Sequence, residues 1–377
     1  MSTPSQTKPA KTADAAAQVA KKLRNITLIA TDAEKLSTSS SMYHDAKARM
    51  SYHAHFLADK FSIEKHVQLF QEATKGKRVL FVGGGDGIAI LPFLCAKHGA
   101  ASVAVIDPSS VMENCMEVAA ENPEIAGRMT FYRQTVAEVA RDLRGQHAEV
   151  PAEGKFDFLF VDWVSNLLTN DSGLVEDLVE ARDSLLKDSG HILPDSATLY
   201  ATGLNDYEFY LSSVDWWSNV YGFSMNAMKD AVLKDPVPGS VPNNAVVTSG
   251  VKVLHVHASE ITRENASYDI AFALSGIYPR TTLNFITLYT QMSFASPTGS
   301  HGFRMFSNPT DSNGIIQPIS FSLPEFVPLS GAEEVKLTMN VQNTPGQKVA
   351  RVLLRGSYPS GDATREFEAA YSYASYE

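Results

Sequence analysis

The chain has 377 residues, of which 20% are charged and 44% hydrophobic, and its formal net charge at pH 7 is −10. This length suffices for two domains with full cores, and no apolar run reaches the roughly 18 residues of a membrane-spanning helix. The acidic balance argues against a general nucleic-acid binder, which needs a basic surface to displace counterions. It is compatible with a basic protein partner, and equally with a role in solubility alone.

Residues 1–40 are rich in Ala, Ser, Thr and Lys and poor in aromatic residues, which predicts a disordered tail. The first residues contain no apolar segment of the kind that forms a secretory signal. The only two cysteines, Cys95 and Cys115, lie in apolar helical contexts, so we expect free thiols in a reducing compartment, the cytoplasm first and the nucleus second. Neither a CxxC nor an HExxH pattern occurs, so the sequence offers no metal site.

Residues 41–194 predict a group of helices followed by a Rossmann-like α/β domain. Spaced apolar positions between 42 and 74 indicate helices. From Arg78 onward, short apolar strands alternate with helices, which predicts a parallel, doubly wound sheet. The expected strands are 78–83, 102–107, 128–133 and 155–163. The expected helices are 87–97, 109–121, one ending at 143, and 174–186.

Residues 195–377 have a different amino-acid composition, in which Val, Thr, Ser, Pro and Gly predominate. Short alternating runs such as "ATLYATGL", "GVKVLHVHA" and "EVKLTMNV" predict an antiparallel β-barrel or sandwich. One aromatic-rich segment interrupts this pattern and is expected to be helical, "DYEFYLSSVDWWSNVYGFSMNAMKDAV" at 206–232.

The first predicted strand runs into a glycine-rich turn, "VLFVGGGDGIAILPF" at 79–93. A strand, such a turn and a helix direct backbone N–H groups at a ligand, and Gly83 and Gly85 allow a close approach. Asp107 ends the next strand, where an acid can bind ribose hydroxyls. The pattern predicts a nucleotide-type site but does not separate NAD from S-adenosylmethionine. A fold element retained without a ligand would look the same.

From about Met42 to its C-terminus the chain resembles the protein arginine methyltransferases. The agreement is densest in "GHILPDSATLYATGL", in "WWSNVYGFSMNAMKD" and in the glycine turn. The order of parts agrees as well, with Pro194 following the last strand of the core. The resemblance implies a Rossmann-type methyltransferase domain followed by an antiparallel β-barrel, with a helical dimerisation arm inserted at 206–235.

The resemblance also shows where the catalytic residues of the family have changed. The family polarises arginine with two glutamates after the fourth strand; Asp162 and Asp171 occupy these positions in "VDWVSNLLTNDSG". Each is shorter by one methylene, about 1.5 Å of reach, and a misplacement of about 1 Å can cost around 10²-fold in rate. A Thr-His-Trp loop of the family falls on Gly314, Ile315 and Ile316. We therefore expect no catalytic residues.

The positions that contact the cofactor in the family are altered too. Phe81 stands where the family has a carboxylate in the first strand, and Ala137 stands where it has a glutamate beside the adenine. Gly83, Gly85 and Asp107 are retained. The loss of each ion-paired contact weakens the binding free energy by about 1.5–3 kcal/mol. A loss of about 1.4 kcal/mol lowers the affinity tenfold. We therefore expect weak or no binding of S-adenosylmethionine, with the cofactor held by a partner subunit.

The arm segment, by contrast, matches the family nearly residue for residue. In the family the arm packs onto the outer helices of a second Rossmann domain. The composition is typical of an interface core; the alternative is that these residues pack within their own barrel. The predicted arm contacts are Trp216, Trp217, Tyr221, Phe223, Met225 and Met228. The predicted acceptor surface includes Leu91, Leu94, Met112 and Met116.

The combination most resembles the inactive regulatory subunit, or prozyme, of a kinetoplastid type I arginine methyltransferase. The leading interpretation is an inactive paralogue that activates an active arginine methyltransferase within a heterodimer or heterotetramer. One alternative is a divergent active methyltransferase that uses Asp162 and Asp171. A second is a non-enzymatic scaffold that recruits basic Arg/Gly-rich substrates through its acidic surface. No nucleic-acid site is expected.

Overall fold

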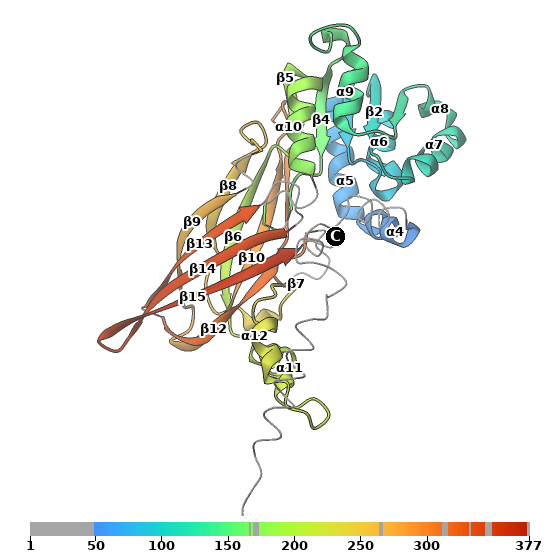
Figure 1. Ribbon diagram of the computed structural model, residues 1–377. Coiled ribbons are helices and arrows are strands. Elements are labelled where there is room, and N and C mark those ends of the chain that lie inside the picture. Colours follow the sequence, from blue (N-terminus) through green and yellow to red (C-terminus); the bar gives the residue numbers. More distant parts are fainter. Residues whose placement is uncertain are drawn as a thin grey trace, which may run out of the picture.

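The computed structural model describes residues 49–165, 167–168, 173–263, 267–299, 301–310, 316–331, 333–343 and 349–374. An α/β domain lies at one end of this chain and an all-β domain at the other (Figure 1). The predicted tail, Asp171, Gly314 and Ile315 lie outside the described residues.

The α/β domain is built on a five-stranded parallel sheet of order β3-β2-β1-β4-β5, which confirms the predicted Rossmann-like architecture. Four of the five residues in "RVLFV" of β1 are buried, as expected for a strand with helices on both faces. The strands are β1 (Arg78–Val82), β2 (Ser102–Ile106), β3 (Met129–Tyr132), β4 (Phe156–Val161) and β5 (Leu186–Leu193).

Helices precede the sheet and cover it. Those before β1 are α4 (Met50–Ala58), α5 (Lys60–Leu69) and the π-helical turn η1 (Phe70–Thr74). The covering helices are α6 (Asp86–Lys97), α7 (Val111–Glu121), α8 (Pro123–Ala126), α9 (Val136–Arg144) and α10 (Leu174–Leu185). The predicted helix 87–97 needs correction, because Gly87, Ile88 and Ala89 have left-handed backbone angles and the right-handed helix begins after them.

The all-β domain consists of two antiparallel sheets. One has the order β7-β12-β10-β6-β8, with β11 paired to β10, and the other has the order β15-β14-β13-β9. Their strands are β6 (Ser196–Leu204), β7 (Val237–Pro238), β8 (Val251–His257), β9 (Tyr268–Ser275), β10 (Arg280–Phe294), β11 (Phe303–Phe306), β12 (Ile319–Ser330), β13 (Glu334–Asn343), β14 (Val349–Ser360) and β15 (Ala363–Ala374). Alternate side chains such as Leu337, Met339 and Val341 are buried, which gives the period of two expected for strands with one face on the core.

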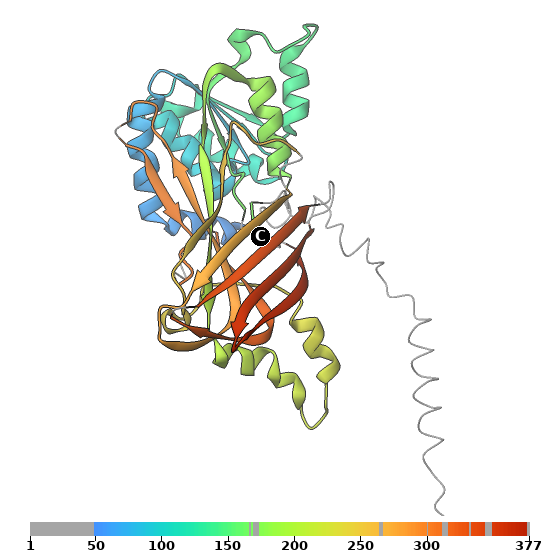
Figure 2. The same ribbon diagram turned by 90° about the vertical axis from the view of Figure 1, so that its left-hand side faces the viewer.

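The arm leaves the barrel between β6 and β7 and projects away from the α/β domain (Figure 2). The prediction of one helical stretch at 206–232 is only partly right. The segment contains α11 (Tyr207–Ser213), two 3₁₀ turns at 215–218 and 226–228, and α12 (Lys229–Val232). A tight turn breaks it where Tyr221 and Gly222 have positive φ and the Asn219 side chain accepts a hydrogen bond from the Gly222 N–H at 2.9 Å.

Several contacts in the described chain join the two domains. The Tyr268 hydroxyl donates to the Leu167 carbonyl at 2.5 Å. The Arg182 guanidinium donates to the carbonyls of Ala258, Ser259 and Ile261 at 2.7–3.3 Å. The β10–β11 hairpin reaches η1, where Glu72 contacts Thr298 and His301. These contacts hold the barrel against the carboxyl ends of the core strands, where ligands bind in this class of sheet.

Candidate functional site

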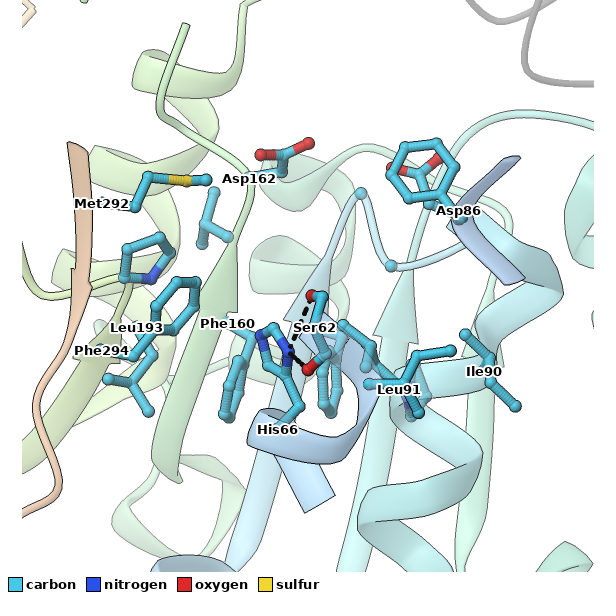
Figure 3. Close-up of a pocket in the computed structure, with 18 of the residues that line it drawn as sticks. Ser62, His66, Asp86, Ile90, Leu91, Phe160, Asp162, Leu193, Met292 and Phe294 are labelled. Carbon is cyan, nitrogen blue, oxygen red and sulfur yellow. Dashed lines mark hydrogen bonds between the residues drawn. The ribbon is translucent and has the colours of Figure 1, made fainter. Parts of the chain in front are cut away.

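A pocket of about 140 Å³ lies where β1, β4 and β5 end, between the N-terminal helices and the β10–β11 hairpin (Figure 3). Most of its lining is apolar, and the described lining residues include no Lys or Arg. The lining is Phe56, Asp59, Ser62, Ile63, His66, Phe81, Val82, Gly83, Gly84, Asp86, Ile90, Leu91, Pro92, Phe160, Val161, Asp162, Leu193, Pro194, Met292, Phe294 and Met305.

Two stacked aromatic rings line one side of the pocket, and a third packs edge-on behind them. Phe81 and Phe160 are paired residues on neighbouring strands, and their rings stack with centroids 4.7 Å apart. The Phe70 ring meets both edge-on, at 6.2 Å from Phe81 and 5.4 Å from Phe160. The Phe81 ring therefore makes the surroundings near the end of β1 apolar. A carboxylate buried among these rings would destabilise the fold because it would lose its hydration.

His66 connects the α/β domain to the barrel through the pocket (Figure 3). Its Nδ1–H donates to the Ser62 carbonyl at 2.8 Å, and its ring meets Phe294 and Phe303 edge-on at about 5 Å. Burial lowers the pKa of His66 to about 4, against the weaker opposing effects of the Ser62 hydrogen bond and Asp59. His66 is therefore neutral at pH 7 and serves as a packing group in this arrangement.

The glycine turn keeps the geometry that its sequence predicts. Gly83 has φ of +70°, and its N–H donates to the Ile106 carbonyl at 2.9 Å. A Cβ at Gly85 would lie 2.7 Å from Val111 Cγ1 and 2.9 Å from Asp107 Oδ2, so only glycine fits there.

Asp107 is buried below this turn at the end of β2. Its Oδ1 accepts a hydrogen bond from the Ser109 N–H at 2.8 Å. Its Oδ2 and the Ser109 hydroxyl have no hydrogen-bond partner within the described parts of the chain. Two neighbouring buried polar atoms thus lack partners, an arrangement that costs about 1–3 kcal/mol for each atom.

The first turn of α6 is strained for a reason visible in the sequence. Ile88 and Ala89 have φ of 55° and 57°, and left-handed geometry costs about 1–2 kcal/mol for each non-glycine residue. A right-handed helix starting at Asp86 would place Pro92 in its interior, at a cost of about 3 kcal/mol. With the left-handed turn, Pro92 falls in the first right-handed turn, where proline is tolerated.

The predicted catalytic positions do not come together within the described chain. Asp162 is exposed at the mouth of the pocket, just after β4. Ile316 is buried but does not line the pocket. Ala137 is exposed in the first turn of α9 and does not line it either. Among the degenerate positions that the structure describes, only Phe81 and Asp162 lie at this pocket.

The arm exposes most of its predicted contact residues. Tyr221 is 95% exposed and Phe223 68%, while Trp216 and Met228 are also exposed. Trp217 and Met225 are half-buried, and the two tryptophan rings meet edge-on with centroids 5.0 Å apart. Packing within its own barrel therefore accounts for only part of the arm. An exposed apolar surface of this kind is typical of an interaction site.

The predicted acceptor surface needs one correction. Leu91 and Leu94 are half-buried on α6 and Met116 is exposed on α7. Met112 is fully buried under the glycine turn and offers no contact surface. Sequence reasoning missed Leu57 and Phe61, exposed apolar residues on α4 and α5. It also missed His66 and the hairpin residues Phe294 and Met305, whose place in the site depends on the fold and has no local motif.

Other classes of site have no support in the described residues. They contain no group of three His, Cys, Asp or Glu side chains that could hold a metal ion. None of their helices is both long and apolar enough to cross a membrane. Cys95 and Cys115 are unbridged and buried, and burial raises the pKa of each thiol to about 12.

The order of parts is a Rossmann-like domain followed by a β-barrel that carries an inserted arm. Residues 195–354 match the family described as the arginine methyltransferase oligomerization subdomain. Protein arginine N-methyltransferase 1 of Oryza sativa subsp. indica is 29% identical over 240 residues, which are 63% of this chain and 58% of that protein. Protein arginine N-methyltransferase 8-B of Danio rerio is 28% identical over 269 residues, which are 71% of this chain and 61% of that protein. The chain thus matches about three-fifths of these relatives' length.

Solved structures agree with this relationship. The structure described as "Trypanosoma brucei PRMT1 enzyme-prozyme heterotetrameric complex with AdoHcy" superposes with a TM-score of 0.76 at 25% identity, covering 86% of this chain and 99% of that one. Arabidopsis thaliana protein arginine methyltransferase 10 matches in fold, with a TM-score of 0.72 at 14% identity, over 88% and 99%. The chain is therefore a relative of the protein arginine methyltransferases in sequence and fold.

Proposed function

We propose that this chain is a catalytically inactive arginine methyltransferase paralogue that binds an active subunit and activates it. The observation that carries the proposal is a contrast between two parts of one molecule. The arm presents exposed aromatic residues, Tyr221 and Phe223 foremost, whereas the pocket beside the glycine turn is lined by the stacked rings of Phe81 and Phe160, with Phe70 packed behind them.

Methyl transfer to arginine requires hydrogen-bond acceptors that orient and polarise a guanidinium group. The pocket has Asp162 at its mouth, but most of its lining is apolar, including Phe294 and Met292 of β10 and Leu193 of β5. This favours loss of the guanidinium site. The alternative, a divergent active enzyme, would depend on Asp162 acting together with Asp171.

The residues only partly fit S-adenosylmethionine. In favour of binding, Asp107 Oδ2 has no hydrogen-bond partner within the described chain, and a ribose hydroxyl could supply one. Against it, Asp107 is buried, Phe81 supplies a ring in place of a carboxylate, and the pocket is smaller than the about 300–1,000 Å³ common for small-molecule sites. We propose that the chain binds this cofactor weakly or not at all and that the partner subunit holds it.

The partner in this proposal is an active arginine methyltransferase. The similar Trypanosoma brucei complex is described as an enzyme–prozyme heterotetramer, which supports an assembly of the same kind here. The arm of this chain would pack on helices of the active subunit, while Leu91, Leu94 and Met116 would receive the arm of that subunit. Ordered helices around the partner's cofactor would then raise its activity.

The decisive experiment co-expresses the full chain with an active paralogue and measures co-purification and arginine methylation. Trp217→Ala with Tyr221→Ala should abolish both, whereas Ile277→Ala, an exposed apolar residue on the barrel, should change neither. Full activity of the paralogue without this chain would refute the activator role. Calorimetric titration of the chain alone tests the cofactor proposal, and micromolar affinity for S-adenosylmethionine would overturn it.

A further inference from the structure

The left-handed first turn of α6 lies beside the pocket, which Leu91 lines, and leads into the part of the helix that carries Leu94. Gly87, Ile88 and Ala89 are left-handed, and the Ala89 N–H donates to the Gly85 carbonyl at 3.2 Å. The described N-terminal helices hold this turn in place: a Cβ at Gly87 would lie 3.5 Å from Phe56 Cβ and 3.6 Å from Leu57 Cδ2. The turn is therefore in contact with α4 on one side and continues into α6 on the other.

Two opposing costs act on this turn and are of similar size. The left-handed conformation is disfavoured at Ile88 and Ala89 because each carries a Cβ. The right-handed alternative is disfavoured at Pro92, which would lack the N–H needed by the Ile88 carbonyl and would collide with it. With the ranges above, the two forms differ by no more than about tenfold in equilibrium constant.

A second observation concerns the residues against which the glycine turn packs. Asp107 Oδ2 and the Ser109 hydroxyl, which follow β2, have no hydrogen-bond partner within the described chain. Gly85 packs against Asp107 and Val111, so a shift of the turn would change the surroundings of Asp107. The strained turn and an unpaired buried carboxylate oxygen are thus linked through the packing of Gly85.

We infer that residues 86–89 form a two-state turn, with the left-handed form described here and a second form in which α6 is right-handed from Asp86. Changing the first turn re-aims Leu91 and Leu94, so docking of a partner on the outer face of α6 favours one form over the other. The docking part of this inference rests on the proposed function; the two-state turn itself does not.

The turn is tested by a matched pair of substitutions in the full chain. Ala89 and Ala96 are both fully buried on α6, but only Ala89 is left-handed. Ala96→Gly should raise the equilibrium constant for unfolding about fivefold, the usual effect of glycine in a right-handed helix. Ala89→Gly should leave this constant unchanged or lower it by up to about tenfold, because glycine relieves the left-handed strain. Urea unfolding measures both.

A third variant acts in the opposite direction. Pro92→Ala removes the obstacle to the right-handed form and should favour it by up to about 100-fold. Hydrogen exchange of the amides of 90, 91 and 93 should then slow, because a helix that is right-handed from Asp86 supplies each of them with the carbonyl four residues earlier. In complexes with the active paralogue, Pro92→Ala and Ala89→Gly should change the dissociation constant in opposite senses.

The outcomes separate the parts of the inference. If Ala89→Gly destabilises as much as Ala96→Gly, or if Pro92→Ala leaves exchange unchanged, the two-state turn is wrong. If the turn responds as expected but both variants bind the paralogue like the unmodified chain, coupling to docking is wrong. Failure of the proposed function itself appears in a different measurement, the co-purification lost or kept with the Trp217 and Tyr221 variants.

Discussion

Acidification from pH 7 to pH 5 should destabilise the fold through His66, and a His66→Gln variant should remove this effect. The pKa of His66 is lowered from 6.5 to about 4 by burial among Phe294, Phe303 and Phe70. Between these values the unfolded chain binds a proton that the folded chain does not, so stability falls as the pH falls. From pH 7 to pH 5 the loss is about 2 kcal/mol.

A second buried group acts with the opposite sign, so the variant comparison is essential. Burial, with Glu176, Asp107 and Glu180 nearby, raises the pKa of Asp177 from 3.8 to about 6. Here the folded chain holds the extra proton, and stability rises by about 1.3 kcal/mol over the same pH interval. The contribution of Asp177 partly offsets that of His66 in the unmodified chain, so only the comparison with a His66 variant isolates the effect of His66.

The assay is urea unfolding of the full chain and of His66→Gln at pH 7 and at pH 5. The difference in unfolding free energy between the two proteins should change by about 2 kcal/mol between these pH values, in favour of the variant at pH 5. His147→Gln, at an exposed histidine, is the control and should leave the pH dependence unaltered. A difference that is equal at both pH values would refute the account of His66 as a buried neutral group.

Three further substitutions test the packing around the pocket and the sheet by urea unfolding. Phe81→Ala should cost about 3–5 kcal/mol because it leaves a cavity beside Phe160; a cost below about 1 kcal/mol would mean that the ring is not packed as described. Gly85→Ala should cost about 1–3 kcal/mol, since its Cβ would lie 2.7 Å from Val111 Cγ1; an unchanged midpoint would contradict this geometry. Thr135→Ala should cost about 1 kcal/mol by removing the capping box that Thr135 forms with Glu138, and Thr135→Ser should retain most of the stability.

Much of the α/β domain could be predicted because its signals are local. The apolar runs at β1, β2 and β4 and the helices between them follow from periodicity alone, and helix 174–186 agrees with α10 to within one residue at its end. The start of α6 was predicted wrongly, although Pro92 carried the signal. A proline six residues into a helical pattern indicates that the regular helix starts later.

The candidate site was less predictable because its walls come from segments far apart in sequence. The glycine turn and Asp107 could be recognised from the pattern of strand, glycines and acid. The packing of His66 against Phe294 and Phe303, more than 200 positions away, depends on the β10–β11 hairpin reaching the N-terminal helices. Met112 was assigned to the surface because a helix pattern alone does not say which apolar face meets the core.

The sequence by itself determined the two kinds of domain, their order, the glycine turn, the substitutions at Phe81 and Asp162, and the aromatic arm. These features depend on residue type and near neighbours, which the sequence contains. Only the tertiary structure decided that Phe81 stacks on Phe160, that the arm leaves Tyr221 and Phe223 in solvent, and that α6 opens with a left-handed turn. These depend on which distant surfaces meet and on the competition between local strain and packing, which no single segment of the chain contains.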